Sequence, residues 1–249
     1  MSKNMKFRVI AEIGSNWEGD IDLAKNHIKE AKNSGASHVK FQMWKAEDLY
    51  DRNHPQWESI KRSELTEDFA KELKKYSDQV GIDWFCSVFN PDAVEVLEKL
   101  DVSMYKIASR TSTLNDKFSF ETIQKVAETN KMTFISTGEG ANKDKISKLF
   151  NKENFQFTYC VSKYPTMDSE INWDELLKYD FFSDHTLGIT IPLIYSIQKK
   201  PLLNDEIFIE KHTRFQDSKG PDSSFAITYN ELSDLNLHLK RIEKLDLVK

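Results

Sequence analysis

The feature that most constrains this chain is a steady alternation of short β-rich runs with amphipathic stretches of helical length, repeated about eight times along 249 residues. Strand and helix in this regular order indicate parallel βαβ units. The β-rich runs are Phe7–Ile13, His38–Gln42, Asp83–Ser87, Ser103–Ala108, Thr133–Thr137, Phe155–Val161, Tyr179–Asp184 and Glu206–His212. The helical stretches begin near Leu23, Asp68, Pro91, Phe118, Asp144, Trp173 and Ile191, and a last one runs from about Tyr229 to Leu245.

Eight such units predict an α/β fold of one domain over residues 1–249, a (β/α)₈ barrel, which typically takes about 250 residues. An open sheet that binds a dinucleotide is disfavoured, because no Gly-x-Gly-x-x-Gly turn follows the first strand. The longest insertion is Met43–Leu65, after the second strand. Long βα loops usually lie at the mouth of a barrel's active site, and a surface flap without function is an equal alternative here.

Composition excludes several classes of partner. The formal net charge is −5, whereas nucleic-acid binding requires clustered Lys and Arg, so we expect no nucleic acid. No apolar run is long enough for a membrane span or a signal peptide, so we expect no membrane association. Cys86 and Cys160 lack metal-ligand spacing and are predicted to be buried free thiols, which suits a reducing, cytoplasmic location.

Polar residues fall at the carboxyl ends of several predicted strands. Residues two apart in a strand share a face, so the apolar partners can face the helices while the polar ones face the barrel axis. Lys and Glu are rarely buried unless they are paired or functional, and the carboxyl ends of barrel strands form the catalytic face. An inward ion pair explains any one of them, but the recurrence favours a site. The inward residues are Glu12, Lys40, Gln42, Lys106, Glu210 and His212.

Two histidines close neighbouring strands, the seventh and the eighth. Adjacent strands lie about 4.8 Å apart, so His185 and His212 can converge on one metal ion. Asp184 or Glu210 is predicted to orient them. Two imidazoles with oxygen neighbours suit Mn²⁺, Fe²⁺, Zn²⁺ or Mg²⁺. Structural histidines without a metal are the alternative.

The same strand ends carry groups that bind anions. Lys40 and Lys106 supply positive charge, and Ser87, Ser109 and Ser136 supply hydroxyl groups at or just past strand ends. The glycines of residues 137–140 let the backbone approach a ligand closely. The combination predicts a site for an anionic small molecule.

Taken together, these motifs resemble the N-acetylneuraminate (sialic acid) synthase family, which includes the legionaminic and pseudaminic acid synthases. The resemblance runs from about Val9 to Leu245. Its motifs occur in this order: Ala11-Glu12-Ile13-Gly14, Lys40-Phe41-Gln42, Tyr105-Lys106-Ile107-Ala108-Ser109, Ser136-Thr137-Gly138, Tyr164-Pro165-Thr166, Ser183-Asp184-His185-Thr186-Leu187-Gly188, Glu210-Lys211-His212 and Gly220-Pro221-Asp222.

The resemblance implies a transferase that adds phosphoenolpyruvate to the open-chain aldehyde of an N-acylated hexosamine. It gives a nonulosonic acid and phosphate, with cleavage of the C–O bond. It implies that His185 and His212 ligate Mn²⁺ or Mg²⁺ and that Glu12 is the acid/base carboxylate. The residues implied to hold phosphoenolpyruvate are Lys40, Ser87, Lys106, Ser109, Ser136 and Ser183. Those implied to face the sugar are Gln42, Tyr164, Glu210 and Asp222.

The chain departs from the family pattern at a few positions. After the first strand the family commonly has Asn-His-Asn-Gly, and this chain has Asn16-Trp17-Glu18-Gly19. An indole and a carboxylate thus replace the polar His and Asn, so we expect the sugar contacts near this loop to differ. Ser223 stands where the family has His after Gly-Pro-Asp, and Ser162 stands where it often has Asn.

Full-length members carry a C-terminal antifreeze-like domain that gives an Arg to the sugar's N-acyl group. This chain stops at Lys249, and we expect that domain to be absent from it. A separate antifreeze-like protein, a different substrate or a weak enzyme are the three interpretations.

Two other functions stay open. One is another phosphoenolpyruvate-utilising or aldolase-type enzyme, which could use Lys106 as a Schiff base. The other is a sugar-binding barrel that no longer catalyses, an interpretation motivated by Trp17.

Overall fold

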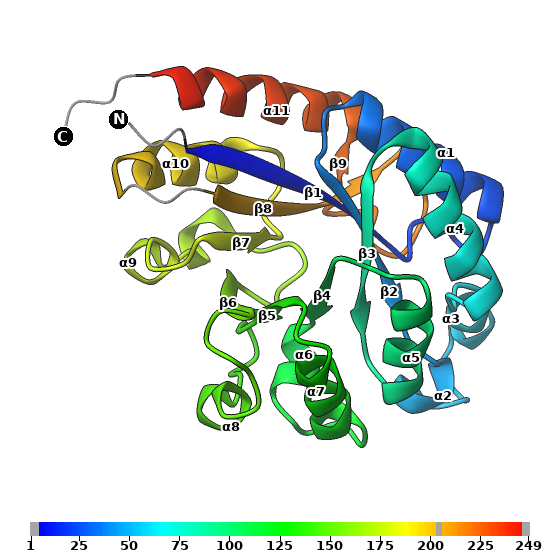
Figure 1. Ribbon diagram of the computed structural model, residues 1–249. Helices are drawn as coiled ribbons and strands as arrows, with labels where there is room; N and C mark the ends of the chain where they lie inside the picture. The colour runs from blue at the N-terminus through cyan, green and yellow to red at the C-terminus, as the bar shows by residue number, and fades with distance from the viewer. Residues whose placement is uncertain (1–4, 203–205, 246–249) are drawn as a thin grey trace.

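A computed structural model describes residues 5–202 and 206–245 and shows a closed barrel of parallel strands wrapped by helices (Figure 1). The predicted (β/α)₈ fold is confirmed. Neighbouring strands pair in sequence order, and β1 also pairs with β8, so the sheet has no open edge among these eight strands. The strands are β1 (Lys6–Gly14), β2 (His38–Met43), β3 (Asp83–Val88), β4 (Met104–Ile107), β5 (Met132–Ser136), β6 (Phe155–Cys160), β7 (Phe181–Asp184) and β8 (Glu206–Arg214).

Helices cover the outside of the barrel. The longer ones start within two residues of the positions that periodicity predicted. The covering helices are α1 (Ile21–Asn33), α4 (Glu67–Val80), α5 (Pro91–Lys99), α7 (Ser119–Glu128), α8 (Lys143–Ser147), α9 (Trp173–Leu176), α10 (Thr190–Lys199) and α11 (Tyr229–Lys244). Smaller elements in the loops are α2 (Ala46–Leu49), α3 (Trp57–Arg62), α6 (Ser109–Ser112), the 3₁₀ turns η1 (Asp168–Glu170) and η2 (Lys200–Leu202), and β9 (Ile227–Thr228).

Local sequence signals explain where several helices begin. The side chain of Asp20 accepts hydrogen bonds from the first backbone N–H groups of α1, and Asn90 does the same for α5 just before Pro91. Thr228 and Glu231 form a reciprocal capping box at the start of α11. These caps fix where each strand gives way to its helix.

Strand alternation separates two apolar layers. Val9, Ala11 and Ile13 of β1 face the helices and belong to the large cluster between sheet and helices. Ile10 faces inward and packs with aromatic rings that close the lower barrel, as in the contact of Phe134 and Phe181, whose ring centroids lie 4.7 Å apart. Above this aromatic plug the inward positions become polar, so the apolar plug forms the floor of the site.

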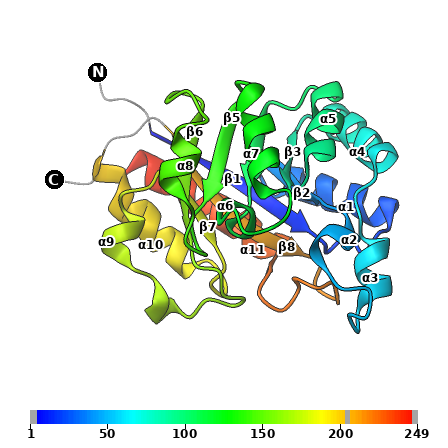
Figure 2. The same cartoon turned by 90° about the horizontal axis from the view of Figure 1, so that it is seen from below.

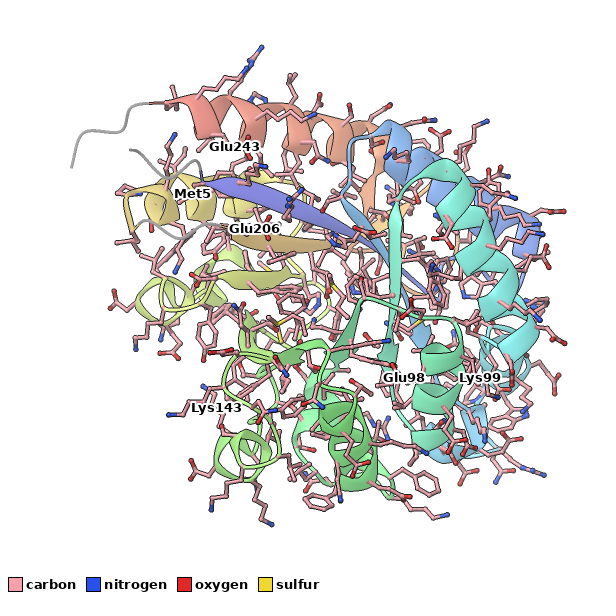
Figure 3. The ribbon with its side chains drawn as sticks, viewed as in Figure 1. Met5, Glu98, Lys99, Lys143, Glu206 and Glu243 are labelled. Carbon is pink, nitrogen blue, oxygen red and sulfur yellow. The ribbon has the colours of Figure 1, made fainter. Side chains whose placement is uncertain are left out.

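The seam between β1 and β8 closes the barrel. Backbone pairing runs from Lys6 opposite Glu206 to Glu12 opposite His212. At the amino end of the seam, the side chain of Glu243 in α11 accepts a hydrogen bond of 2.8 Å from the backbone N–H of Phe7. Figure 3 shows Glu206 and Glu243 at this end, away from the strand ends that carry the predicted site.

Two further expectations concern the chain as a whole. Cys86 and Cys160 are free and buried, as predicted. Within residues 5–202 and 206–245, no helix is long and apolar enough to cross a membrane.

Buried His27 in α1 makes stability depend on pH. Its side chain is fully buried and its Nδ1 lies 2.5 Å from the hydroxyl of Tyr229, and burial lowers the pKa of His27 to about 4. Because the folded-state pKa lies below the unfolded value of about 6.5, the unfolded chain binds more protons between these values. The contribution of neutral His27 is therefore present above pH 6.5 and is lost as the pH falls toward 4.

We predict that the free energy of unfolding falls more in the parent protein than in a His27→Gln variant as the pH drops from about 6.5 to 4, by up to about 3 kcal/mol. Urea unfolding at several pH values measures this. His238→Gln, at an exposed position of α11, is the control and is expected to keep the parent's pH dependence. Parallel curves for the parent and His27→Gln would contradict the prediction.

Candidate active site

The carboxyl ends of the strands surround a polar cavity of about 60 Å³ on the barrel axis. Every residue predicted for the site lines it except Asp222, which contacts one of its histidines. The lining residues are Glu12, Lys40, Gln42, Ser87, Lys106, Ala108, Ser109, Ser136, Cys160, Tyr164, Ser183, His185, Glu210 and His212. Residues that are far apart in sequence thus meet because parallel strands end at the same face.

The buried ammonium group of Lys40 in β2 connects this strand to β1, β3 and β8. The Nζ of Lys40 lies 2.7 Å from Glu12 Oε2 and donates to Ser87 Oγ at 2.8 Å. Its distance to Glu210 Oε2 is 3.7 Å. Burial alone would lower the pKa of Lys40, but the carboxylates of Glu12 and Glu210 outweigh burial and raise it. Gln42 donates 2.8 Å to the other oxygen of Glu12 and so fixes that carboxylate.

A second buried pair joins β4 to β8. Lys106 Nζ lies 3.1 Å from Glu210 Oε1, and Ser183 donates to the same oxygen at 2.6 Å. Burial would raise the pKa of Glu210, but the charges of Lys106 and Lys40 and the Ser183 hydroxyl lower it to about 2. Burial lowers the pKa of Lys106, and Glu210 and the other groups that favour its charged form do not offset burial. Lys106 also lies 4.9 Å from the ring centroid of Phe181 in the plug.

The two predicted metal ligands lie side by side at the carboxyl ends of β7 and β8. The ring centroids of His185 and His212 are 5.5 Å apart. His185 Nδ1 lies 2.8 Å from the carbonyl oxygen of Val161, and His212 Nδ1 lies 3.3 Å from Asp222 Oδ2. Burial, reinforced by His212, lowers the pKa of His185 to about 3, so this ring is neutral at neutral pH.

These contacts fit a divalent cation. The Nδ1 of His185 lies at hydrogen-bond distance from the Val161 carbonyl, whereas the Nδ1 of His212 lies at ion-pair distance from Asp222 without hydrogen-bond geometry. Partners of this kind orient metal-binding histidines and leave the Nε2 atoms for an ion. Within the part of the chain that the structure describes, no three His, Cys, Asp or Glu side chains form a metal cage. Two imidazoles with further positions open to water or substrate are the donor set of a catalytic ion rather than of a closed structural one.

Neither Asp184 nor Glu210 contacts a histidine ring, so the prediction that one of them orients the rings directly is wrong. Asp184 faces away from the barrel axis, where its Oδ2 lies 2.9 Å from Lys211 Nζ. Glu210 is occupied by Lys106, Lys40 and Ser183. Side chains alternate along a strand, so a residue directly before an inward-facing histidine faces the helices instead of the ring. The groups that contact the rings come from loops: the Val161 carbonyl and the Asp222 carboxylate.

A wider cavity of about 320 Å³ lies at the mouth and shares Gln42 with the inner one. The insertion Met43–Leu65 and the segment after β8 form its walls, and Figure 2 shows α2, α3 and that orange segment at one end of the barrel. Its lining residues are Ser15, Glu18, Gln42, Trp44, Tyr50, His54, Gln56, Ser59, Ile60, Ser63, Lys219, Gly220, Pro221 and Asp222.

Asp222 joins the mouth to the histidine pair. Its carboxylate lies so close to Gly14 that a Cβ there would come within 2.4 Å of Oδ2, and Gly14 has a positive φ of 54°. The backbone N–H of Asp222 donates to Asn16 Oδ1 at 3.1 Å. Burial would raise the pKa of Asp222, but its contact with His212 lowers it, so the group is a carboxylate beside that ring.

The expectation that Trp17 alters sugar contacts is wrong. Trp17 is 1% exposed and packs edge-on against Phe69 of α4 and Phe41 of β2, with centroid distances of 5.7 Å and 6.5 Å. It belongs to the layer between sheet and helices, away from both cavities. Only its neighbour Glu18 reaches the mouth. The substitution therefore affects packing in the core, and it no longer supports the interpretation that this barrel binds a sugar without catalysis.

Sequence reasoning missed three contributors to the site. Cys160 lines the inner cavity, with its Sγ 2.9 Å from Ser109 Oγ, and Ser109 Oγ accepts a hydrogen bond of 3.0 Å from the backbone N–H of Gly138. Strand alternation could have placed Cys160 inward beside Ser183, its partner across β6 and β7. The carbonyl of Val161 and the ring of Phe225, 4.9 Å from His212, carried no comparable signal.

Fold and site define a class: a (β/α)₈ barrel whose catalytic face holds paired lysines and carboxylates beside two histidines. The family model described as the NeuB family matches residues 27–247, and the chain belongs to that family.

Two relatives and one solved structure illustrate the similarity. The chain is 32% identical to an uncharacterized protein of Methanocaldococcus jannaschii and 28% identical to the human N-acetylneuraminate-9-phosphate synthase. Each match covers 95% of this chain, and the chain spans 71% and 70% of those proteins. The crystal structure of the N-acetylneuraminic acid synthetase of Leptospira borgpetersenii superimposes with a TM-score of 0.85 at 26% identity, over 99% of this chain and 88% of that one.

The core position of Trp17 yields a prediction. Replacement by Ala removes its contacts with Phe41 and Phe69 and is expected to lower the free energy of unfolding by about 3–5 kcal/mol. Ligand affinity of the two cavities should change by no more than about twofold, since neither cavity contains the indole. Urea unfolding and titration calorimetry measure the two quantities. A large loss of ligand affinity in the Trp17→Ala variant with unchanged stability would instead indicate that Trp17 contributes to the binding site.

Proposed function

We propose that this protein condenses phosphoenolpyruvate with the open-chain aldehyde of an N-acylated amino sugar, giving a nonulosonic acid and phosphate. One observation carries the proposal: two buried lysines, serine hydroxyls and a pair of oriented, metal-competent histidines line one cavity of a NeuB-family barrel. An anionic substrate and an activated carbonyl can meet there.

The anion would bind to Lys40 and Lys106. Both are paired with carboxylates, so binding requires their ammonium groups to exchange part of those contacts for phosphate and carboxylate oxygens. This exchange keeps the lysines neutralised and orients the substrate. The hydroxyl groups proposed to complete the anion site are those of Ser87, Ser109, Ser136 and Ser183.

The sugar would enter through the mouth cavity and meet the histidine pair. A divalent ion held by His185 and His212, Mn²⁺ or Mg²⁺, supplies Lewis-acid polarisation of an aldehyde oxygen and an activated water when bound. Asp222 keeps His212 oriented and also lines the mouth cavity, where its carboxylate can accept a hydrogen bond from a sugar hydroxyl group. Gln42, Tyr164 and Glu210 are the other proposed sugar contacts.

The proton transfer is assigned to Glu12. Its carboxylate is 99% buried and held between Gln42 and Lys40. The methylene carbon C3 of phosphoenolpyruvate forms the new C–C bond with the aldehyde carbon, whose oxygen takes up a proton to become a hydroxyl, and water adds to C2, the carbon that bears the phosphate. Glu12 accepts the proton of that water, after which the C–O bond breaks and phosphate leaves. In this scheme the bridging oxygen departs with phosphate.

The rim of the mouth suggests how the site is closed. Tyr164, Met167 and Leu187 are 52%, 62% and 60% exposed on two loops that a backbone bridge between Thr166 and Thr186 joins, and the Tyr164 ring lies 4.4 Å from that of His185. Exposed apolar side chains at a functional mouth favour a covering surface. We propose that an antifreeze-like domain, in the same or another polypeptide, covers this rim and supplies the Arg for the N-acyl group.

A second candidate is an aldolase that uses Lys106 covalently. Burial lowers the pKa of this amine, which favours the neutral nucleophile that imine formation requires. Borohydride treatment with pyruvate or a sugar aldehyde distinguishes the two reactions. The condensation mechanism predicts no trapped adduct, and a covalent adduct on Lys106 would favour the aldolase.

The first test is release of phosphate from phosphoenolpyruvate with Mn²⁺ present. The acceptors are N-acetylmannosamine, its 6-phosphate and diacetamido-trideoxyhexoses. We expect release that depends on the sugar and falls at least about 100-fold in a variant carrying both His185→Ala and His212→Ala. Absence of release with every sugar, with and without an added antifreeze-like domain, would contradict the proposed reaction.

Metal removal gives a separate prediction. Treatment with EDTA is expected to abolish sugar-dependent phosphate release, and added Mn²⁺ is expected to restore it, because the histidine pair supplies only two protein ligands and releases its ion readily. Circular dichroism checks that the fold survives the treatment. Full activity after complete removal of metal would argue against a metal-dependent reaction.

A further inference from the structure

We propose that the buried ion pair between Lys211 and Asp184 positions the two histidines His185 and His212. These residues touch neither cavity, and their role would be to fix the strand ends that carry the histidines. The inference builds on the metal site of the proposed function, and its test includes a measurement that needs no metal.

The pair is completely shielded from solvent. Both side chains have 0% exposure, and Lys211 Nζ lies 2.9 Å from Asp184 Oδ2. The same ammonium group donates to the carbonyl oxygen of Thr186 at 2.6 Å. The carboxylate of Asp184 accepts from the backbone N–H of Thr186 at 2.9 Å and from its hydroxyl at 3.0 Å. Asp184 and Lys211 therefore hold each other and Thr186 through directional bonds.

The position of the pair in the sheet connects it to the histidines. Asp184 and Lys211 are direct partners in the pairing of β7 with β8, and each comes immediately before one histidine in the chain. Alternation places the ion pair on the helix side of the sheet and the imidazoles on the axis side. Because Lys211 also binds Thr186, the residue after His185, the backbone of His185 is anchored on both sides.

A further contact holds the same histidine from the neighbouring loop. The backbone carbonyl of His185 accepts a hydrogen bond of 3.0 Å from the N–H of Thr166. Together with the bond from the His185 ring to the Val161 carbonyl, this fixes the ring relative to the loop after β6. Lys211 supplies the corresponding connection to β8, which carries the second histidine.

Energetics argue that the pair does more than fill space. Taking two charges out of water is expensive, and well-packed apolar residues of similar size are often equally or more stable in such places. Two residues earlier along each strand, on the same face of the sheet, β7 and β8 instead pair Phe182 with Ile209, and both side chains are almost fully buried. Between the sheet and the helices, the contacts thus change from apolar packing to an ion pair at the pair of residues directly before the two histidines.

The chain offers a matched control for a purely structural role. Lys199 of α10 is also buried, lies 2.8 Å from a carboxylate oxygen of Asp180, and donates to the carbonyl of Leu177 at 2.7 Å. Asp180 precedes the amino end of β7, whereas the histidines follow its carboxyl end. Loss of either lysine removes a buried ammonium group from its ion pair, although the Asp180 side chain is 31% exposed, and of the two lysines only Lys211 is adjacent to a histidine.

The experiment compares Lys211→Met with Lys199→Met in the intact chain. Ring-nitrogen NMR of ¹⁵N-histidine-labelled, metal-free protein reports the tautomer and environment of His185 and His212, and calorimetry reports Mn²⁺ affinity. We expect both variants to lose stability. Only Lys211→Met should shift the ring signals of His185 and His212 and weaken Mn²⁺ binding, by about 10–100-fold, as found for groups that orient metal ligands.

A second variant guards against simple misfolding. Lys211→Met combined with Asp184→Leu leaves no unpaired buried carboxylate, so it should regain stability without regaining Mn²⁺ affinity or the parent ring signals. Parent-like ring signals and affinity in the folded single or double variant would overturn the inference. Failure of the parent itself to bind Mn²⁺ would instead refute the metal part of the proposed function, while the metal-free ring signals would still decide the role of Lys211.

Discussion

Backbone pairing between β1 and β8 is the constraint on which the rest of this structure depends. It closes the sheet, so the eight strand ends form a ring rather than a row. The register sets Glu12 opposite His212 across the seam and Glu12 opposite Lys40 across the next pair of strands. A shift by one residue would turn the inward polar groups toward the helices and dissolve the site.

The barrel interior is divided into an apolar lower part and a charged upper part. The plug around Phe134 and Phe181 excludes water below, so the ion pairs of Lys40 and Lys106 lie in a weakly screened environment. The carboxylates and ammonium groups neutralise each other's charge, which stabilises them there. The lowered pKa of Glu210 reflects this, because the charges of Lys106 and Lys40 favour its ionised form. The same arrangement prepares both ammonium groups for an anionic ligand that can take over part of the carboxylates' role.

Two levels of support surround the histidines. Loop groups, the Val161 carbonyl and the Asp222 carboxylate, contact the rings directly. Behind the sheet, Lys211 and Asp184 connect the backbones from which the rings project. Asp222 also lines the mouth cavity, so the segment after β8 connects the wall of that cavity to the ring of His212.

The sequence by itself determined the barrel and the inward residues, because period-two alternation and helix caps are local properties of neighbouring residues. It therefore placed Glu12, Lys40 and Lys106 correctly on the axis side. Tertiary structure alone decided which groups meet across strands and loops. It decides that Trp17 packs in the core, that Asp184 pairs with Lys211, and that Asp222 contacts His212. Such partners depend on strand stagger and loop path, which distant segments set together and no local pattern records.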